Sequence, residues 1–204
     1  DALKIIIDHV GGIEQIKAMG IGAPNGNYYK GTVEFAPNLS WGRDGTVPLA
    51  DMFSKALGIP VGLTNDANAA AIGEMTYGVA RGMKNFIVIT LGTGVGSGIV
   101  IDGKVVYGSD GFAGELGHVT MVRKDGRLCG CGRRGCLEAY CSATGVARTA
   151  RELLETTDEE SLLREMKPED ITSLDVSIAA EKGDALAKRI FDLTGEMLGR
   201  ACAD

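Results

Sequence analysis

The sequence holds no long hydrophobic segment and no run of basic residues. No apolar stretch approaches the roughly 20 residues that a membrane-spanning helix needs. Acidic residues outnumber basic ones 27 to 21, which gives a formal net charge of −6, and no basic cluster could follow a phosphate backbone. We therefore expect neither a membrane protein nor nucleic-acid binding by this segment.

Targeting signals, internal repeats and low-complexity segments are also missing. The first residues lack the basic-then-apolar pattern of a signal peptide, so we expect a cytoplasmic protein. The composition, 45% hydrophobic and 24% charged over 204 residues, is typical of a globular protein with a substantial core. The chain begins with Asp1 rather than Met and ends at Asp204 inside a helical pattern, and we expect a fragment of a longer protein.

Histidine is scarce, and one of the two histidines stands just before a cluster of cysteines. His118 is followed by Cys129, Cys131 and Cys136, which are three of the five cysteines in the chain. Three thiolates and one imidazole form a closed tetrahedral ligand set, and four protein ligands leave no position for a metal-bound water. The pattern predicts a structural zinc site.

Ordinary buried thiols or a disulfide are the alternative for this cluster. Cys129 and Cys131 are too close in sequence for an easy mutual bridge. Glycines let the backbone wrap around an ion, and they stand at positions 130, 132 and 135. Three thiolates carry more charge than one zinc ion, and Arg133 and Arg134 would offset the excess. Reduced cysteines arranged as metal ligands also agree with a cytoplasmic location.

Two glutamates frame the cluster. Glu115 and Glu138 each lie within three residues of a predicted ligand, so a bound metal would fix them as well. The ring N–H of His118 that does not bind metal could face a carboxylate or a ligand hydroxyl. For either glutamate alone, a solvated surface charge is the simpler interpretation. Together with the metal, they predict a polar pocket.

A short strand is predicted over 60–64, and Asn65 and Asp66 follow it directly before an alanine-rich helix over 67–77. Asn and Asp are preferred at helix N-caps, so capping is the simpler interpretation of this pair. A carboxylate at the junction of a strand and a helix is also well placed for chemistry, because it lies at the end of a sheet.

A buried strand is predicted over 86–91, and it leads into four glycines in seven residues. A dinucleotide-binding loop would open a helix, whereas a β-hairpin follows here, with strands over 99–101 and 105–107 around the turn Asp102-Gly103. No Gly-Lys-Ser/Thr follows, which excludes a P-loop. A tight turn alone would not require so many glycines. The segment therefore predicts a hairpin tip whose N–H groups and Thr93 hydroxyl cradle phosphate.

Helices are predicted for most of the C-terminal third. A helix capped by Ser142 is expected first, and two more follow over 173–182 and 185–203. The remaining cysteines, Cys141 and Cys202, are predicted to be core thiols.

Four motifs, in unbroken order between about residues 20 and 142, resemble the ROK family. This family contains bacterial sugar kinases, glucokinases prominent among them, and sugar-responsive repressors. The motifs are Leu63-Thr64-Asn65-Asp66-Ala67-Asn68, Leu91-Gly92-Thr93-Gly94-Val95-Gly96, Gly114-Glu115-Leu116-Gly117-His118 and Cys129-Gly130-Cys131-Gly132-Arg133-Arg134-Gly135-Cys136-Leu137-Glu138.

The resemblance implies an α/β fold of the actin-like, ribonuclease-H-like ATPase class, with two lobes and a substrate cleft, here incomplete. Residues 1–66 would belong to the small α/β lobe. Residues 67–204 would belong to the large lobe, which carries the phosphate hairpin, the zinc site and the C-terminal helices.

The resemblance also implies roles for single residues. Asp66 would be the general base that accepts the proton of a hexose hydroxyl during phosphoryl transfer. Sugar would be bound by Asn65, Asp66, Glu115, His118 and Glu138. The second phosphate loop of the family would hold ATP, whose phosphates Mg²⁺ bridges, through Gly92, Thr93, Gly94 and Gly96.

The expected function is ATP-dependent phosphorylation of a hexose, with conversion of glucose to glucose 6-phosphate as the leading case. A sugar-sensing repressor and a zinc-stapled binding module without catalysis are the alternatives. The first phosphate loop of the family, of the type Asp-x-Gly-Gly-Thr, is absent from these residues, and its adenosine-binding region is expected after residue 204. We therefore expect the fragment alone to be inactive and the whole protein to form a homo-oligomer, a dimer or a tetramer.

Overall fold

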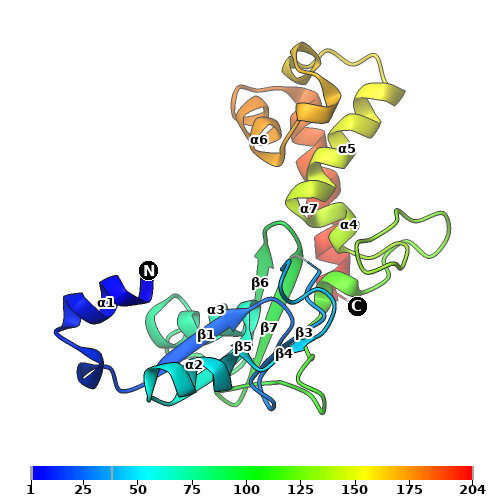
Figure 1. Cartoon of the computed structure of the whole chain (residues 1–204). Coiled ribbons are helices and arrows are strands. Elements are labelled where there is room, and N and C mark those ends of the chain that lie inside the picture. The colour runs from blue at the N-terminus through cyan, green and yellow to red at the C-terminus, as the bar shows by residue number, and fades with distance from the viewer. Residues whose placement is uncertain (1, 38, 204) are drawn as a thin grey trace. The chain divides into compact units, whose positions relative to one another are not determined.

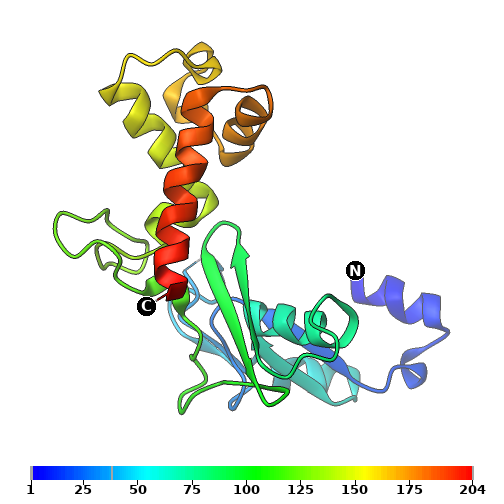
Figure 2. The same cartoon turned by 180° about the vertical axis from the view of Figure 1, so that it is seen from behind.

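The computed structural model describes residues 2–37 and 39–203. The chain separates into two compact units, and Figures 1 and 2 show it from opposite sides. Residues 1–88 and 97–114 form the first unit, and residues 89–96 and 115–204 form the second. The lobe boundary at residue 66 concerns the whole protein and stays a prediction.

Within the described residues, the first unit combines short sheets with three α-helices and one 3-10 helix. In chain order its elements are α1 (Ala2–Val10), the 3-10 helix η1 (Ile13–Gln15), β1 (Met19–Ala23), β2 (Gly26–Asn27), β3 (Thr32–Glu34), β4 (Thr46–Val47), α2 (Leu49–Leu57), β5 (Val61–Asn65), α3 (Asp66–Tyr77) and β8 (Lys104–Val105). Strands β6 (Phe86–Leu91) and β7 (Val95–Ile101) each contain residues of both units.

A parallel pair of strands, β1 and β5, lies at the centre of the first unit. The register places Ala23 opposite Asn65, so both strands end at the same edge. Helix α3 begins directly after β5 and packs against β1. Leu63 of β5 is buried in a small core with Val33 and Ala50, which fixes the strand beneath the start of the helix. Asp66 is thereby placed at the carboxyl edge of the strand pair.

The hairpin predicted after the glycine-rich segment is confirmed. Asp102 and Gly103 have φ of 52° and 74°, the left-handed conformation that a two-residue hairpin turn requires at both central positions. Strand β7 begins at Val95, earlier than predicted, so Gly96 and Gly98 lie inside a strand rather than in a loop. A Cβ at Gly98 would lie 2.6 Å from the Cβ of Ala71 in α3, which explains the need for glycine there.

The prediction that residues 86–91 form a buried strand is wrong about burial. The strand forms as β6, but Ile87 is 48% and Leu91 51% exposed. Among the described residues, the sheet has only three strands, in the order β6-β7-β8. A continuous apolar run predicts a strand that can be covered on both faces, and it does not say which residues provide the cover.

The second unit is mainly helical. Its elements are η2 (Leu116–His118), α4 (Glu138–Cys141), α5 (Ala143–Thr156), η3 (Leu162–Glu165), η4 (Pro168–Asp170), α6 (Ser173–Glu181) and α7 (Ala185–Ala203). The predicted cap of α5 is confirmed, because the Ser142 hydroxyl accepts the Gly145 N–H at 3.1 Å. In the part of the chain that the structure describes, no helix is both long and apolar enough to cross a membrane.

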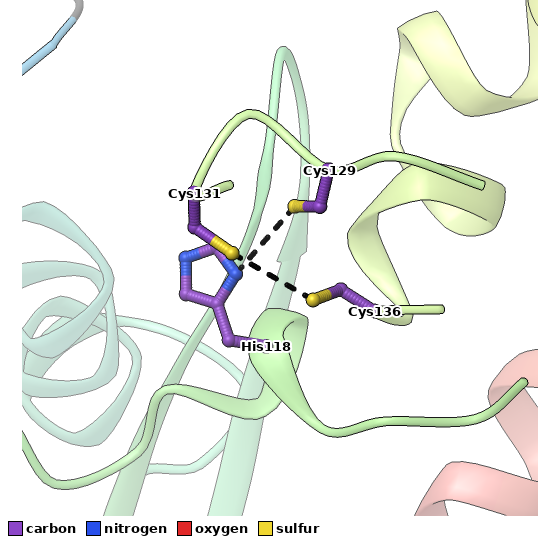
Figure 3. A group of neighbouring side chains, drawn as sticks. All are labelled: His118, Cys129, Cys131 and Cys136. Atoms are coloured by element: carbon purple, nitrogen blue, oxygen red, sulfur yellow. Dashed lines mark hydrogen bonds between the residues drawn. The ribbon is translucent and has the colours of Figure 1, made fainter. Parts of the chain in front are cut away.

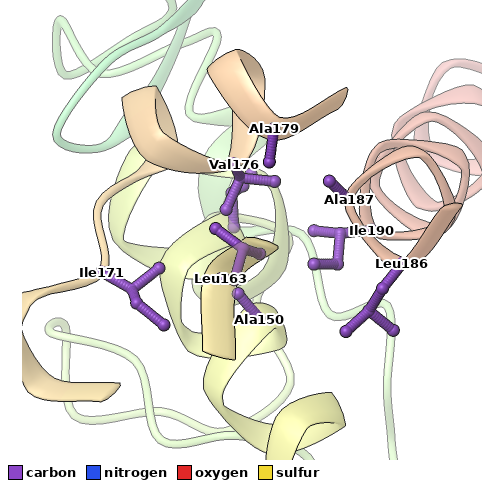
Figure 4. Packing of buried hydrophobic residues seen from close by; sticks show 9 residues of the cluster. Ala150, Leu163, Ile171, Val176, Ala179, Leu186, Ala187 and Ile190 are labelled. Atoms are coloured by element: carbon purple, nitrogen blue, oxygen red, sulfur yellow. The ribbon is translucent and has the colours of Figure 1, made fainter. Parts of the chain in front are cut away.

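Figure 4 shows the larger core of the second unit, where side chains from α5, η3, α6 and α7 point toward one another. Leu186 and Ile190 lie one turn apart on α7 and are fully buried against this core, as is Leu163. Cys141 is buried, as predicted. The prediction for Cys202 is wrong, because it occupies an exposed position in the last turn of α7.

Candidate functional site

The four predicted metal ligands meet in the second unit (Figure 3). One ligand atom from each of His118, Cys129, Cys131 and Cys136 lies within 4.8 Å of all the others. The sulfurs of Cys131 and Cys136 are 3.7 Å apart, and the Cys129 sulfur lies 3.8 Å from Nδ1 of His118. Two sulfurs bound to one tetrahedral zinc at about 2.3 Å are separated by ~3.8 Å. The cluster therefore has the spacing that zinc requires, and all five cysteines are free thiols.

A small hairpin shapes the cysteine loop. Leu128 forms a β-bridge with Arg134, and the Cys129 N–H donates to the Arg133 carbonyl at 2.8 Å. Gly132, at the tip, has φ of 85°, a conformation that favours glycine. The tip folds the chain back, so that Cys129 and Cys131 face the same point as the ligand that follows.

The second half of the loop is fixed by close backbone contact. Gly135 has φ of 80°, and a Cβ at this position would lie 1.8 Å from the Val122 carbonyl oxygen. Met121 and Val122 both donate N–H bonds to the Gly135 carbonyl. A Cβ at Gly130, by contrast, would meet open space. The loop therefore requires glycine at positions 132 and 135 but not at position 130.

Burial and local charge set the protonation of the thiols. Burial raises the pKa of Cys129 to about 12, and the neighbouring Glu138 carboxylate adds to this effect. Burial also raises the pKa of Cys136. For Cys131, burial acts in the same direction, but hydrogen bonds from Arg133 outweigh it and the pKa is lowered. A bound zinc ion would deprotonate all three thiols, because a coordinating thiol loses its proton outright.

The two arginines of the loop have different partners. The hydrogen bond with the Cys131 thiol raises the pKa of Arg133, whose guanidinium also donates to the His118 carbonyl at 2.8 Å. Arg134 instead donates to the Gly126 carbonyl at 3.2 Å. Arg133 is therefore placed to offset negative charge on the cluster, as predicted, whereas Arg134 supports the backbone of the loop.

Glu138 lies between the metal cluster and the glycine-rich turn. The Cys129 thiol lies 3.5 Å from its Oε1, and its Oε2 accepts the Val95 N–H at 3.0 Å. The side chain is half-buried, so the surface-charge interpretation of Glu138 does not hold. Glu115 is exposed, and its carbonyl accepts the His118 N–H at 3.0 Å, which links its backbone to that ligand.

The glycine-rich segment forms a compact turn between β6 and β7. The Gly92 N–H donates to the Gly94 carbonyl at 3.0 Å, and the Gly92 carbonyl accepts the Ala143 N–H at 2.9 Å. Gly92 and Thr93 are exposed and Gly94 is half-buried. Of the residues predicted to bind phosphate, these three form the turn, and Gly96 lies inside β7.

Asn65 and Asp66 stand at the start of α3. The Asn65 Oδ1 and the Asp66 Oδ1 both accept the Ala67 N–H at 2.9 Å, which confirms the capping interpretation. Asp66 is exposed, so capping does not remove its carboxylate from solvent. This pair belongs to the first unit and the predicted sugar ligands Glu115, His118 and Glu138 to the second. A joint sugar site therefore stays a prediction.

Sequence reasoning missed Arg127, which connects the segment that carries the three cysteine ligands, here called the metal loop, to the helices. Its side chain is 10% exposed, and Nη2 lies 2.6 Å from Oε2 of Glu152 in α5. Burial raises the pKa of Glu152, but the hydrogen bond from Arg127 outweighs it and the net pKa is lowered. The guanidinium carbon lies 4.6 Å from the centre of the Tyr140 ring, a cation–π contact. Nothing in the local charge pattern singles out this arginine.

Comparison with known proteins decides the family. The family model described as "ROK family" matches residues 1–204. The chain belongs to the ROK family. Over 207 residues it is 41% identical to a glucokinase of Halalkalibacterium halodurans, an alignment that covers 100% of the chain and 62% of that protein.

Solved structures support the same assignment. A ROK family glucokinase from Streptomyces griseus, in complex with glucose and AMPPNP, superposes with a TM-score of 0.78 at 38% identity, over 99% of this chain and 66% of that one. A ROK family transcriptional regulator, a homolog of the E. coli MLC protein, gives a TM-score of 0.83 at 29% identity, over 99% and 50%. The predicted mixed α/β, actin-like fold is confirmed. The chain spans about two thirds or less of the length of these relatives.

Proposed function

We propose that the whole protein is an ATP-dependent sugar kinase that phosphorylates a hexose hydroxyl, with glucose as the leading substrate. The observation that carries the proposal is the 38% identity, over 99% of this chain, to a glucokinase whose solved complex contains glucose and AMPPNP.

Asp66 accepts the proton of the reacting hydroxyl. A sugar hydroxyl is a poor nucleophile, and a carboxylate at hydrogen-bond distance removes its proton as the phosphoryl group is transferred. Asp66 suits this role because it is exposed and is held at the end of β5 by the first turn of α3. Asn65, Glu115, His118 and Glu138 bind the other hydroxyls of the sugar, since a polyol needs several hydrogen-bond partners.

His118, Cys129, Cys131 and Cys136 hold a structural zinc ion. When bound, zinc crosslinks the loop and leaves no open coordination position, so it takes no part in the transfer itself. Nδ1 is the ring nitrogen of His118 that faces the sulfurs, and Nε2 then carries the proton and donates to a sugar hydroxyl. Metal binding and sugar binding thus use opposite edges of one imidazole ring.

The exposed turn Gly92–Gly94, with Gly96 behind it, receives the phosphates of ATP. Glycines let a backbone approach a phosphate closely, and the Thr93 hydroxyl adds a donor. Mg²⁺ accompanies the nucleotide and neutralises phosphate charge.

A sugar-sensing repressor is the second candidate function. The TM-score of 0.83 to a ROK transcriptional regulator favours it. The Asn65-Asp66 pair and the glycine turn favour the kinase, because a sensor has no need of a general base or a phosphate cradle.

A substrate panel on the full-length protein tests the proposal. Glucose, N-acetylmannosamine and fructose are supplied with ATP and Mg²⁺, and sugar binding is measured separately by calorimetry. A kinase should turn over one of these sugars at a rate on the order of 1–100 s⁻¹. Sugar binding without ATP consumption would instead support the sensor, and absence of both would reject the two candidates together.

A further inference from the structure

We propose that Glu138 is a positioning residue that couples sugar binding to the conformation of the glycine turn, so that sugar and nucleotide bind cooperatively. The proposal rests on the proposed kinase function, because it assigns a sugar to one side of Glu138 and nucleotide phosphates to the other. It concerns contacts that lie entirely within the second unit.

The α4–α5 segment holds the glycine turn at both ends. At the start of the turn, the Gly92 carbonyl accepts the N–H of Ala143, the first residue of α5, at 2.9 Å. At its end, the Val95 N–H donates to the carboxylate of Glu138, the first residue of α4, at 3.0 Å. The first anchor is backbone and cannot respond to a ligand. The second is a side chain that can.

The carboxylate also packs against the middle of the turn. A Cβ added at Gly94 would lie 2.5 Å from Oε2 of Glu138, a distance at which one of the two groups must move. Glycine at this position therefore leaves room for the carboxylate. A shift of the Glu138 side chain therefore changes the space available to Gly94. It also changes the hydrogen bond between the carboxylate and the Val95 N–H.

The backbone of Glu138 is fixed, whereas its carboxylate has a second partner. Leu137 is fully buried in a core that also contains Val95, so the first turn of α4 stays close to the start of β7. The other oxygen, Oε1, lies 3.5 Å from the Cys129 sulfur. This contact orients the carboxylate weakly, because a thiol is a weak hydrogen-bond donor.

Sugar binding would therefore order this side chain. A hydroxyl that donates to Glu138 restricts its rotamers, and the turn is then already arranged when nucleotide arrives. The second ligand binds more tightly because the conformational entropy of the turn was already lost when the first ligand bound. Each ligand therefore raises the affinity for the other by the same factor. Glucose should strengthen nucleotide binding, and nucleotide should strengthen glucose binding by the same factor.

Calorimetry on the full-length protein measures this factor. The dissociation constant for glucose is determined without nucleotide and with saturating AMPPNP and Mg²⁺. The wild-type protein should bind glucose about 5- to 150-fold more tightly when the nucleotide is present. No change in affinity, or weaker glucose binding, would overturn the proposal.

Two substitutions of different length separate coupling from sugar contact. Glu138→Asp is one methylene too short to reach the Val95 N–H, so the affinity ratio should fall to about 1. Glu138→Gln keeps an oxygen acceptor at the original length, so the ratio should survive although glucose affinity itself drops. If both variants lose affinity and keep the wild-type ratio, Glu138 only contacts sugar and the proposal fails.

A matched pair of glycine substitutions tests the packing of the carboxylate. An added methyl at Gly92 meets open space, whereas at Gly94 it meets Glu138. Without nucleotide, Gly94→Ala should weaken glucose binding, and Gly92→Ala should leave it near the wild-type value. Equal glucose affinities of the two variants would contradict the contact.

Hydrogen exchange of residues 92–96 provides a readout that needs no ligand. Exchange should rise in Glu138→Asp and remain as in wild type in Glu138→Gln, because only the shorter side chain releases the Val95 N–H. Unchanged exchange in Glu138→Asp would overturn the anchoring. If the wild-type protein binds neither sugar nor nucleotide, the proposed function and the proposed coupling are both wrong. The exchange measurement then still shows whether Glu138 holds the Val95 N–H.

Discussion

Asn65 and Asp66 have two predicted tasks, helix capping and proton acceptance, that the sequence could not separate. Either side chain could cap α3 on sequence grounds, and a capping Asp66 would leave less reason to assign it chemistry. The structure places Asn65 at the N-cap and Asp66 at the first helical position, where it is exposed. Both side chains accept the Ala67 N–H, so the cap does not depend on the carboxylate alone, and the two roles can be tested by different substitutions.

Asp66→Asn should abolish most of the activity of the full-length protein and preserve its fold. An amide cannot accept the hydroxyl proton, and loss of a general base typically lowers turnover ~10²- to 10⁴-fold. Thermal unfolding and glucose affinity are measured beside turnover with ATP, Mg²⁺ and glucose.

The control for this substitution is Asn65→Ala, which removes the N-cap acceptor and leaves Asp66 alone to accept the Ala67 N–H, at a cost of up to about 1 kcal/mol of stability. Asp66→Asn should show no such loss, because Asn65 still accepts the Ala67 N–H. A folded Asp66→Asn protein that binds glucose and turns over within a few-fold of wild type would remove Asp66 from the mechanism.

At the scale of the element, the features that the sequence predicted are those with local causes. Ser142 caps α5 through a bond to a residue three positions away, and the Asp102-Gly103 turn closes a hairpin through its own backbone conformation. The metal ligands also come from one short segment, so their meeting needs only a loop of the right shape. Local chemistry of this kind is readable without knowledge of the tertiary structure.

Features that depend on distant partners were missed or mistaken. Arg127 pairs with Glu152, 25 positions away, and Val95 bonds to Glu138, 43 positions away. Neither partner carries a periodic or spacing signal that would identify the other. The exposure of Cys202 likewise depends on what covers the end of α7, which composition does not reveal.

The metal loop provides the test at this scale. Cys131→Ser should lower the zinc content from about one ion per chain and lower both stability and glucose affinity, because the loop carries a closed four-ligand site beside Glu138. Zinc content, thermal unfolding and glucose binding are measured together on the full-length protein.

Cys202→Ser is the matched control for the loop. Both cysteines are exposed, so each substitution loses little packing, and a difference between the variants reports on the metal. If Cys131→Ser behaves like Cys202→Ser in all three measurements, or loses stability with glucose affinity intact, the loop does not act as a metal clamp for the sugar site.

On the scale of the whole molecule, the chain contains separate hydrophobic cores. One belongs to the first unit, around Val33 and Leu63. Two belong to the second, one around Leu186 and Ile190 and the other around Leu137 beside the metal loop. Units with their own cores commonly unfold in separate steps, and a single free energy of unfolding then does not describe the chain.

Zinc removal should accordingly change one unit and spare the other. All four ligands lie in the second unit, so a metal that binds only the folded site stabilises that unit alone. At a free zinc concentration 100 times the dissociation constant, the stabilisation is about 2.7 kcal/mol, which corresponds to ~10–20 °C in the midpoint of a unit of this size. Calorimetry of the 204-residue chain with and without a chelator should show two transitions, of which one moves by this amount. Hydrogen exchange should assign the moving transition to residues 115–141 and leave residues 19–65 unchanged. A single transition would mean that the two units unfold as one, and two transitions that shift equally would mean that the metal stabilises both units.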